Sequence, residues 1–385
     1  MKIFAHSLAL ICLLLVAPQG APGAEAKDPI KPKPVHHDQL FSEPKVLQLK
    51  IEIPPASIEA LKKDPKAYVK ATIREGDKAY ADAGVRLKGH GVFEADKKPS
   101  LALKFNEFTS GLHFHGHTKL FLENAHQDPT FLAEALGNEI FRAADVPAAK
   151  VTFARVELNG ADLGLYVVEQ AVNREFLADY FSKTKGNLYE GVHADISDKL
   201  ERDAGDTSKD QSDLKKAADA AKEPDPAQRL KKLAVVVDLD RFISFAATEV
   251  LLCHNGGYSL ARNNYRVYHD PLADRLVFIP HSADQLFGKA DAPLLPAWKG
   301  LLAKAVFDNP EGQRRYRERM AAILGKAGKV ETLHARLNEL AGKIRPALAV
   351  DPARAKAFDT ALATLRDRIA QRMYFIEQEL KKPVK

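Results

Sequence analysis

The chain has 385 residues, which is too long for one compact core of ordinary size and indicates a two-lobed domain or two domains. Its 45% hydrophobic and 28% charged residues are typical of a soluble globular protein and exclude a disordered or fibrous one. A net charge of +6 is a mild basic excess that does not argue for nucleic acid as a partner, and two cysteines exclude a disulfide framework.

Residues 1–26 are predicted to be an export signal. Lys2 forms a short basic region, Leu8 to Val16 form an apolar run, and Ala24 and Ala26 are the small residues that signal peptidase requires. The apolar run is too short to span a bilayer as a mature helix. We therefore expect a secreted or periplasmic protein without a membrane partner after cleavage, the alternative being an uncleaved N-terminal anchor.

The N-terminal half after a disordered leader (residues 27–45) is predicted to be rich in β-strands. Four segments with strand-like patterns and Gly-containing turns predict an antiparallel meander: Val46 to Ile53, Tyr68 to Ile73, Lys78 to Lys88 and Ser100 to Phe105. Thr130 to Ala144 has helical periodicity, and a hairpin is expected from Val151 to Val168 around the turn Asn159-Gly160.

The C-terminal half is predicted to be richer in helices. The aromatic-free, Asp- and Lys-rich segment 197–232 is expected to be a solvated helical insertion, and Leu239 to Cys253 a buried helix. Paired strands follow at Asn264 to His269 and Arg275 to Pro280, and the chain is helical from Pro310 onward. Strands first and helices later are the pattern of an α+β protein with two lobes.

Seven segments in consistent order resemble the CotH (spore coat protein H) kinase-like family of exported atypical protein kinases. They are VRLKGHG (85–91), LALKF (101–105), KLFLENAHQDPTFLAEAL (119–136), VPAAKVTFARVELNGADLGLYVVEQ (146–170), GNLYEG (186–191), NNYRVYHDP (263–271) and VFIPHSADQLFG (277–288). The resemblance implies a two-lobed protein-kinase-like fold, with a β-rich N-lobe at 46–172 and a helical C-lobe at 173–385. It also implies ATP with Mg²⁺ or Mn²⁺ as cofactors, and phosphate transfer to Ser or Thr of an unidentified extracytoplasmic protein.

Three basic residues on predicted strands are candidates for binding the phosphates. Arg86 and Lys88 share one face of a strand beside Gly89, where the backbone can approach a phosphate, and Lys104 lies on the next strand. Kinase-like transfer needs cations on the phosphates, so the resemblance makes Lys104 or Arg86 the expected contact. The alternative is a solvated basic edge that discourages aggregation.

Further candidates follow from the same resemblance. The helix at Thr130 to Ala144 would carry the glutamate that pairs with a lysine, and helical spacing allows only one of Glu134 and Glu139 to point inward. Glu169 would lie where kinases connect their lobes, and would bind the ribose or a lysine unless it is a solvated linker residue.

Two positions depart from the family pattern. Gly256 stands where the family has the aspartate that serves the acceptor hydroxyl, and Ser282 replaces the first carboxylate of the metal-binding segment. Asp284 is retained there as a catalytic metal ligand, and Asn264 is a second candidate ligand unless it only forms a turn. The hypotheses are therefore an active kinase using Lys104 and Asp284, or a pseudokinase that serves as a nucleotide- or protein-binding module.

Histidines and the single cysteine of the mature chain offer other sites. His113, His115 and His117 have the alternate spacing of metal ligands on a strand, although the glycines at 111 and 116 favour a loop with polar histidines over a metal site. His254 and His281 flank the predicted site as replacement acid–base groups. Cys253 ends an apolar helix and is expected to be a small core residue.

Overall fold

The computed structural model describes residues 39–89, 91–205 and 210–383. The predicted export signal and most of the leader lie outside these residues. Within them, no helix is long and apolar enough to cross a membrane.

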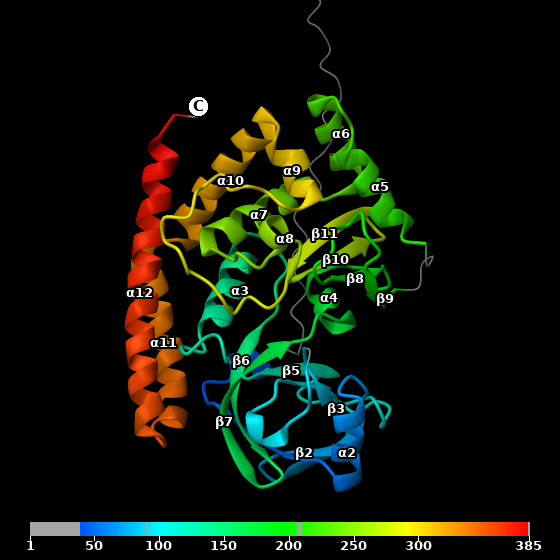
Figure 1. Ribbon diagram of the computed structural model, residues 1–385, viewed down its shortest axis with the longest axis vertical. Helices are drawn as coiled ribbons and strands as arrows, with labels where there is room; N and C mark the ends of the chain where they lie inside the picture. The colour runs from blue at the N-terminus through cyan, green and yellow to red at the C-terminus, as the bar shows by residue number, and fades with distance from the viewer. Residues whose placement is uncertain (1–38, 90, 206–209, 384–385) are drawn as a thin grey trace, which may run out of the picture. The chain divides into compact units, whose positions relative to one another are not determined.

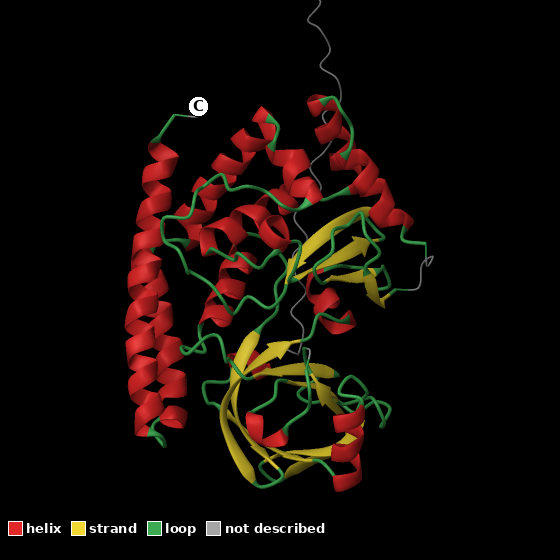
Figure 2. Ribbon diagram, viewed as in Figure 1, coloured by secondary structure: helices red, strands yellow, loops and turns green. Residues whose placement is uncertain are grey.

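The N-terminal strands close into a barrel (Figures 1 and 2). Among the described residues its order is β1-β2-β3-β4-β5-β7-β6, with the strands β1 (Leu47–Glu52), β2 (Val69–Glu75), β3 (Lys78–Leu87), β4 (Leu101–Lys104), β5 (Lys119–Glu123), β6 (Val151–Leu158) and β7 (Ala161–Gln170). The predicted meander is confirmed for β1 to β4, which pair in antiparallel order. Closure comes from a parallel pairing of β1 with β6, where Leu49 faces Val156.

Alternating apolar residues explain why the barrel closes. Successive residues of β1 are buried and exposed in turn, so Leu49 and Ile51 point into the interior. Tyr80, Phe105 and Phe114 fill the same interior, and the rings of Phe105 and Phe114 stack with centroids 5.1 Å apart. The expected open meander is therefore a closed barrel, because an open edge would leave backbone donors and acceptors unpaired.

A second sheet in the described residues has the order β11-β10-β8-β9. It contains β8 (Leu188–Gly191), β9 (Glu201–Ala204), β10 (Tyr265–Asp270) and β11 (Arg275–Pro280). The predicted pairing of β10 with β11 is confirmed, with Tyr265 opposite Pro280. This sheet and the helices confirm the mixed α+β class.

The helices of the described chain pack on both sheets: those between residues 212 and 252 contact the second sheet, and the first two contact the barrel (Figure 2). They are α1 (Gln39–Ser42), α2 (Pro55–Lys63), α3 (Ala133–Ala143), α4 (Arg174–Tyr180), α5 (Ser212–Ala221), α6 (Pro226–Val236), α7 (Leu239–Leu252), α8 (Tyr258–Ala261), α9 (Leu301–Phe307), α10 (Pro310–Ala327), α11 (Val330–Leu348) and α12 (Pro352–Lys381). Helix α7 is buried along almost its whole length, as its apolar sequence predicts.

The segment 197–232 differs from the solvated insertion that its composition predicts. It forms β9, α5 and the first part of α6, and α5 buries Leu214, Ala217 and Ala218 in the largest hydrophobic cluster. Small alanines spaced three and four residues apart make a helix face that packs closely. The average polarity of the segment does not reveal this apolar face, because the lysines and aspartates lie on the opposite side of α5.

A buried arginine joins α12 to the end of α7. The Arg372 side chain has no exposed surface, and its guanidinium donates to the carbonyls of Val250 (2.6 Å) and Leu251 (3.3 Å). It also donates to the carbonyls of Ala290 (3.1 Å) and Ala292 (2.5 Å). The last carbonyl groups of a helix lack hydrogen-bond partners within the helix, and the guanidinium of Arg372 donates hydrogen bonds to two of them at the end of α7.

We predict that Arg372→Lys lowers the free energy of unfolding by at least about 3 kcal/mol. One ammonium cannot reach both sets of carbonyls, and each hydrogen bond to a charged group contributes roughly 1.5–3 kcal/mol. Urea denaturation followed by circular dichroism measures the change. Arg368→Lys, at an exposed position one turn earlier in α12, is the matched control, and equal midpoints for the two variants would contradict the prediction.

Candidate functional site

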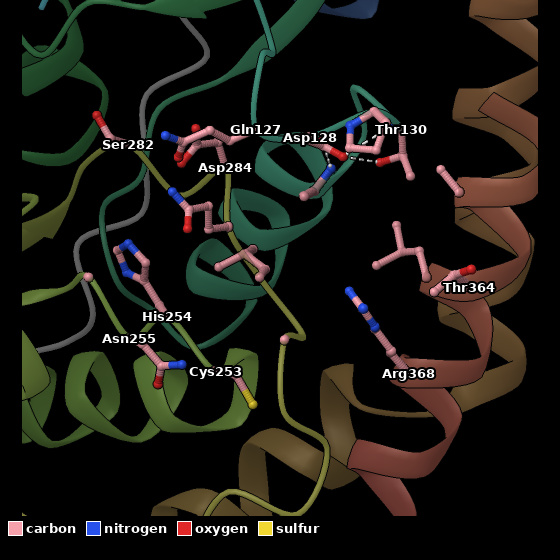
Figure 3. A pocket seen from close by; sticks show the side chains of 18 of the residues that line it. Gln127, Asp128, Thr130, Cys253, His254, Asn255, Ser282, Asp284, Thr364 and Arg368 are labelled. Carbon is pink, nitrogen blue, oxygen red and sulfur yellow. Dashed lines mark hydrogen bonds between the residues drawn. The ribbon is translucent and has the colours of Figure 1, made fainter. Parts of the chain in front are cut away.

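A cleft of about 520 Å³ contains Asp284, Asn264 and Gly256, three positions singled out by the sequence (Figure 3). We call it the loop cleft, because loops after α7, β11 and β5 form most of it. Helix α12 supplies another wall through Thr364, Leu365 and Arg368. Figure 3 shows Asp284 and Asp128 on one side of this cleft and Arg368 on the other.

The loop that presents Asp284 is held at both ends. The backbone N–H of His281 donates to the carbonyl of Asn264 (3.1 Å), and that of Phe287 donates to the carbonyl of Leu252 (2.7 Å). Ser282 and Phe287 have left-handed backbones, with φ of 49° and 55°. Non-glycine residues adopt this conformation at a cost, and such strain gathers at functional sites.

Lys88 directly follows β3 and lies among buried carboxylates. Its ammonium pairs with Glu123 and lies 3.5 Å from Oε2 of Glu169, which is 2% exposed. Burial raises the pKa of Glu169, and Lys88 opposes this effect. Glu169 is therefore a buried partner of a lysine, and the alternative of a solvated linker residue is wrong.

Glu134, in the first turn of α3, also points inward. It is buried, and its Oε1 atom has no hydrogen-bond partner. Burial raises the pKa of Glu134 well above its ordinary value, and Glu169 raises it further while Lys88 lowers it. Glu139 instead forms a bidentate pair with Arg336, at 2.7 Å and 2.9 Å. The prediction that only one of the two glutamates points inward is confirmed.

A second cleft of about 390 Å³ lies beside Lys88, between strands of the barrel and of the second sheet. We call it the strand cleft. Its cationic lining residues are Lys66, Arg86, Lys88, Lys119 and Arg266, its acidic ones Glu123, Glu190, Glu201 and Asp203. Burial, followed by the nearby Arg266, Arg86 and Lys104, lowers the pKa of Lys119 to about 8. The cations therefore outweigh the acids at Lys119.

A small cavity of about 40 Å³ lies between the two clefts. Glu123 lines both this cavity and the strand cleft, whereas Ser282 and Asp284 line both the cavity and the loop cleft. Burial raises the pKa of Asp284, and Lys88 is the nearest side chain that lowers it. Lys88 and Asp284 therefore act on each other electrostatically across this junction.

Lys104 lies outside the lining of both clefts, where it shares the ring of Tyr68 with Arg86. Its ammonium lies 2.5 Å from Oε2 of Glu107 and 5.5 Å from the ring centroid of Tyr68. Lys104 lines neither cleft, whereas Arg86, Lys88 and Gly89 line the strand cleft. Lys88 is the lysine that pairs with the carboxylates of Glu123 and Glu169. Lys104, at the end of β4, pairs instead with Glu107, three residues further along the chain.

Sequence reasoning overlooked four charged residues of these clefts. Glu123 and Lys119 flank the apolar segment of β5, and Arg266 lies on β10 with its Nη2 atom 3.2 Å from Oε1 of Glu190. Charged residues at the ends of short apolar strands are a detectable signal. Arg368 had no such signal, since α12 carries many basic residues and only packing shows which one faces the cleft.

Gly256 and its neighbours show what replaced the expected aspartate. A Cβ atom at Gly256 would lie 3.0 Å from Nδ2 of Asn264, and one at Gly257 only 2.0 Å from Oε1 of Glu249. Gly257 therefore favours glycine, because the buried Glu249 occupies the space, whereas a side chain at Gly256 would require the half-buried amide of Asn264 to shift. Apart from Asp284, the carboxylate that lines the loop cleft is Asp128, which accepts hydrogen bonds from Thr130 and Ala133 at the start of α3.

The two histidines proposed as replacement acid–base groups lie in different clefts. His254 lines the loop cleft and His281 lines the strand cleft. Burial lowers the pKa of His254 to about 4, and burial together with Arg266 lowers that of His281 well below its ordinary value. Both rings are therefore neutral at pH 7, and they do not form one acid–base pair.

The histidines of residues 113–117 are engaged separately. His115 lies 2.7 Å from Oε2 of Glu75, His113 lies 2.6 Å from the carbonyl of Gly111, and His117 is buried against the ring of Phe41. In the described part of the chain, no group of three or more His, Cys, Asp or Glu residues could hold a metal ion. Cys253 is a buried core residue, as predicted, with Sγ 3.2 Å from the carbonyl of Lys289.

Comparison with known families identifies the family of the chain. The CotH kinase protein family model matches residues 85–381. The chain belongs to the CotH kinase family. Inner spore coat protein H of Bacillus subtilis (strain 168) is 21% identical over 354 residues, which cover 85% of this chain and 95% of that protein. The resemblance found in the sequence is thereby confirmed.

Two solved structures are distant neighbours of this CotH kinase chain. The Helicobacter pylori proinflammatory kinase CtkA is 10% identical with a TM-score of 0.37, covering 70% of this chain and 92% of its own. A Shewanella oneidensis MR-1 complex of the toxin–antitoxin proteins HipA and HipB with operator DNA is 12% identical with a TM-score of 0.27, covering 69% and 61%. These scores support no argument about the lobes.

Glu249 makes the stability of this region dependent on pH. Burial raises its pKa from 4.5 to about 8, although the backbone N–H of Ser259 donates to its Oε2 (3.0 Å). Between pH 4.5 and about pH 8, the carboxyl group of Glu249 keeps its proton in the native state and has released it in the unfolded state. Stability contributed by this group therefore falls as the pH rises.

We predict that Glu249→Gln removes this loss, because an amide still accepts from Ser259 and does not titrate. From pH 5 to pH 8, the variant should gain on the order of 2–4 kcal/mol relative to the unsubstituted protein. Urea denaturation at both pH values measures the free energy of unfolding of each protein. Subtracting one protein from the other cancels the titration of groups that both contain. Glu318→Gln, at an exposed position, is the control. An unchanged difference between pH 5 and pH 8 would refute the prediction.

Proposed function

We propose that this CotH-family protein binds ATP with Mg²⁺ or Mn²⁺ and acts mainly as a catalytically impaired kinase-like module. The observation on which this rests is the small cavity lined by Asp284 and by Glu123, the ion-pair partner of Lys88, with Gly256 and Ser282 in place of two expected carboxylates. The geometry supports nucleotide binding more strongly than turnover.

The strand cleft is the proposed site of the nucleotide phosphates. Arg86, Lys88, Lys119 and Arg266 line it, and the pKa of Lys119 is lowered first by burial and then by the neighbouring cations Arg266 and Arg86. A polyphosphate would relieve the repulsion among these cations. Gly89, with φ of 82°, leaves its backbone open to close approach. Glu169 holds Lys88 in place and would contact the nucleotide only through it.

Asp284 and Asn264 are the residues that would hold a divalent cation. One carboxylate and one amide oxygen, with phosphate oxygens and water, form a donor set that Mg²⁺ accepts. Asp284 lines both the loop cleft and the small cavity. This position suits a metal-binding carboxylate that lies between the nucleotide and the acceptor. The cation would neutralise charge on the phosphates. Asn264 is held beside Gly256 by its left-handed backbone, with φ of 49°.

Phosphate transfer is impaired because no free carboxylate faces the acceptor side. Gly256 has no side chain, and Asp128 is occupied by three hydrogen bonds at the start of α3. General-base assistance contributes roughly 10²–10⁴-fold to a rate. We expect its loss to leave binding intact and slow the transfer by about this factor.

The second candidate is an active kinase that phosphorylates Ser or Thr of an extracytoplasmic protein. Retention of Asp284 and Asn264 in one cleft favours it. The predicted export signal, and a relative named as a spore coat protein, support action outside the cytoplasm for either candidate. For this candidate, the substrate is a protein that offers the hydroxyl group of a Ser or Thr residue.

Nucleotide binding is predicted to depend on Lys88 and Asp284 rather than on Lys104. We expect ATP with Mg²⁺ to raise the melting temperature of the unsubstituted protein, because a ligand of the native state stabilises it. Lys88→Met and Asp284→Asn should weaken the apparent affinity at least tenfold. Lys104→Met, which removes an equal charge outside both clefts, is the control. Equal loss in all three variants would contradict the assignment.

The same proteins separate the two candidates when they are incubated with ATP labelled at the γ-phosphate. An impaired module binds ATP in the shift assay and incorporates no label with either Mg²⁺ or Mn²⁺. An active kinase incorporates label, and Asp284→Asn abolishes it. Absence of both binding and label would refute the proposed function.

A further inference from the structure

A third cavity, of about 250 Å³, has not been assigned a role by the nucleotide proposal. Lys97 and Lys98, the N-terminal part of α12 and residues 124–131 contribute to it, and we call it the lysine pocket. Residues 127, 128 and 130 line the loop cleft, whereas 124, 125, 126 and 131 line the lysine pocket. One segment therefore separates the two cavities, and only Pro129 lines both.

The lysine pocket is lined by basic residues, and Asp351 pairs with one of them, Arg354, from outside the lining. Its ionisable lining residues are Lys97, Lys98, Arg354 and His126, and none of its lining residues is Asp or Glu. Among the described residues, neither lysine has a carboxylate oxygen within ion-pair distance, and the ammonium of Lys98 donates to the carbonyl of Asn124 (3.0 Å). The lining of the strand cleft, in contrast, includes four acidic side chains beside five cationic ones.

Lys98 is held in the pocket against an electrostatic cost. Its ammonium lies 5.1 Å from the ring centroid of Phe131 and 5.0 Å from that of Tyr166, and its backbone is left-handed with φ of 51°. Burial, and then the nearby Arg354, lower the pKa of Lys98 to about 8. A strained, partly buried cation placed near a second cation is an arrangement that a bound anion stabilises.

Arg354 completes the arrangement from α12. Its guanidinium packs so closely on Gly164 that a Cβ atom there would lie 2.7 Å from Nη1, and it lies 3.4 Å from Asp351 of its own helix turn. Phe131 and Phe358 line the pocket beside these cations. A guanidinium presents donors in the planar geometry that matches a phosphate.

We propose that the lysine pocket binds a phosphate group, as the free ion or as a small phosphate ester, between Lys98 and Arg354. This site is separate from the proposed nucleotide site, because it shares no residue with the strand cleft. Its occupation orders residues 124–131. That segment contains Asp128, the residue that accepts hydrogen bonds at the start of α3, so a bound phosphate also stabilises one wall of the loop cleft.

Thermal-shift titration of the full chain with sodium phosphate at pH 7, without nucleotide or divalent cation, tests the site. Sodium chloride at equal ionic strength is the salt control, and O-phosphoserine is the ester. We expect both phosphates to raise the melting temperature, and Lys98→Met and Arg354→Gln each to weaken the apparent affinity at least tenfold. Arg354 is exposed, so its variant is expected to fold even if Lys98→Met does not. Tighter binding of one probe identifies the free ion or the ester.

Acylation of lysines, quantified by mass spectrometry, distinguishes this site from the nucleotide site. Phosphate should protect Lys98 several-fold and leave the reactivity of Lys119 unchanged. Arg314→Gln, which removes an exposed and ion-paired arginine of α10, should retain the full response. Protection of Lys119 alone, or a melting-temperature rise that is equal in all variants, would overturn the proposal without affecting the nucleotide assignment.

Discussion

The ammonium of Lys88 is the cation on which the arrangement of the site depends. It follows β3 and faces Glu123 of β5 and Glu169 of β7, while Glu134 of α3 and Asp284 of the loop after β11 lie within its electrostatic influence. Isolated buried carboxylates are costly, and they resist ionisation unless a cation compensates them. One lysine therefore links three barrel strands to a helix and a loop that come from later in the chain. Burial raises the pKa values of Glu169, Glu134 and Asp284, and Lys88 lowers each of them.

This charge arrangement is compatible with nucleotide binding and poorly suited to fast transfer. In the proposed assignment, the cations of the strand cleft would contact the polyphosphate, and Asp284 would bind the divalent ion. At the acceptor side, Gly256 is closely packed against Asn264, so restoring an aspartate there would also require Asn264 to move. A family member that has lost this carboxylate thus has a repacked loop rather than an empty position.

Helix α12 has a larger part than its surface-like sequence suggests. Arg372 anchors it to the carbonyls at the end of α7, Arg368 faces the loop cleft, and Arg354 lines the lysine pocket. Three arginines of one helix therefore have three different environments. Arg368 and Arg354 lie at two different cavities, and residues of the segment 124–131 line both of these cavities.

The sequence by itself determined the α+β class, the family, the buried helix α7, the hairpin of β10 and β11, and the grouping of Asp284 with Asn264. These features depend on local periodicity or on motifs whose residues lie close together in the chain. The tertiary structure decided that the barrel closes through β1 and β6, that Lys88 rather than Lys104 joins the acids, and that Arg368 and Arg354 line cavities. Such choices depend on contacts between residues far apart in the sequence, and a lone lysine or arginine has the same local pattern whether it faces solvent, a carboxylate or a cleft.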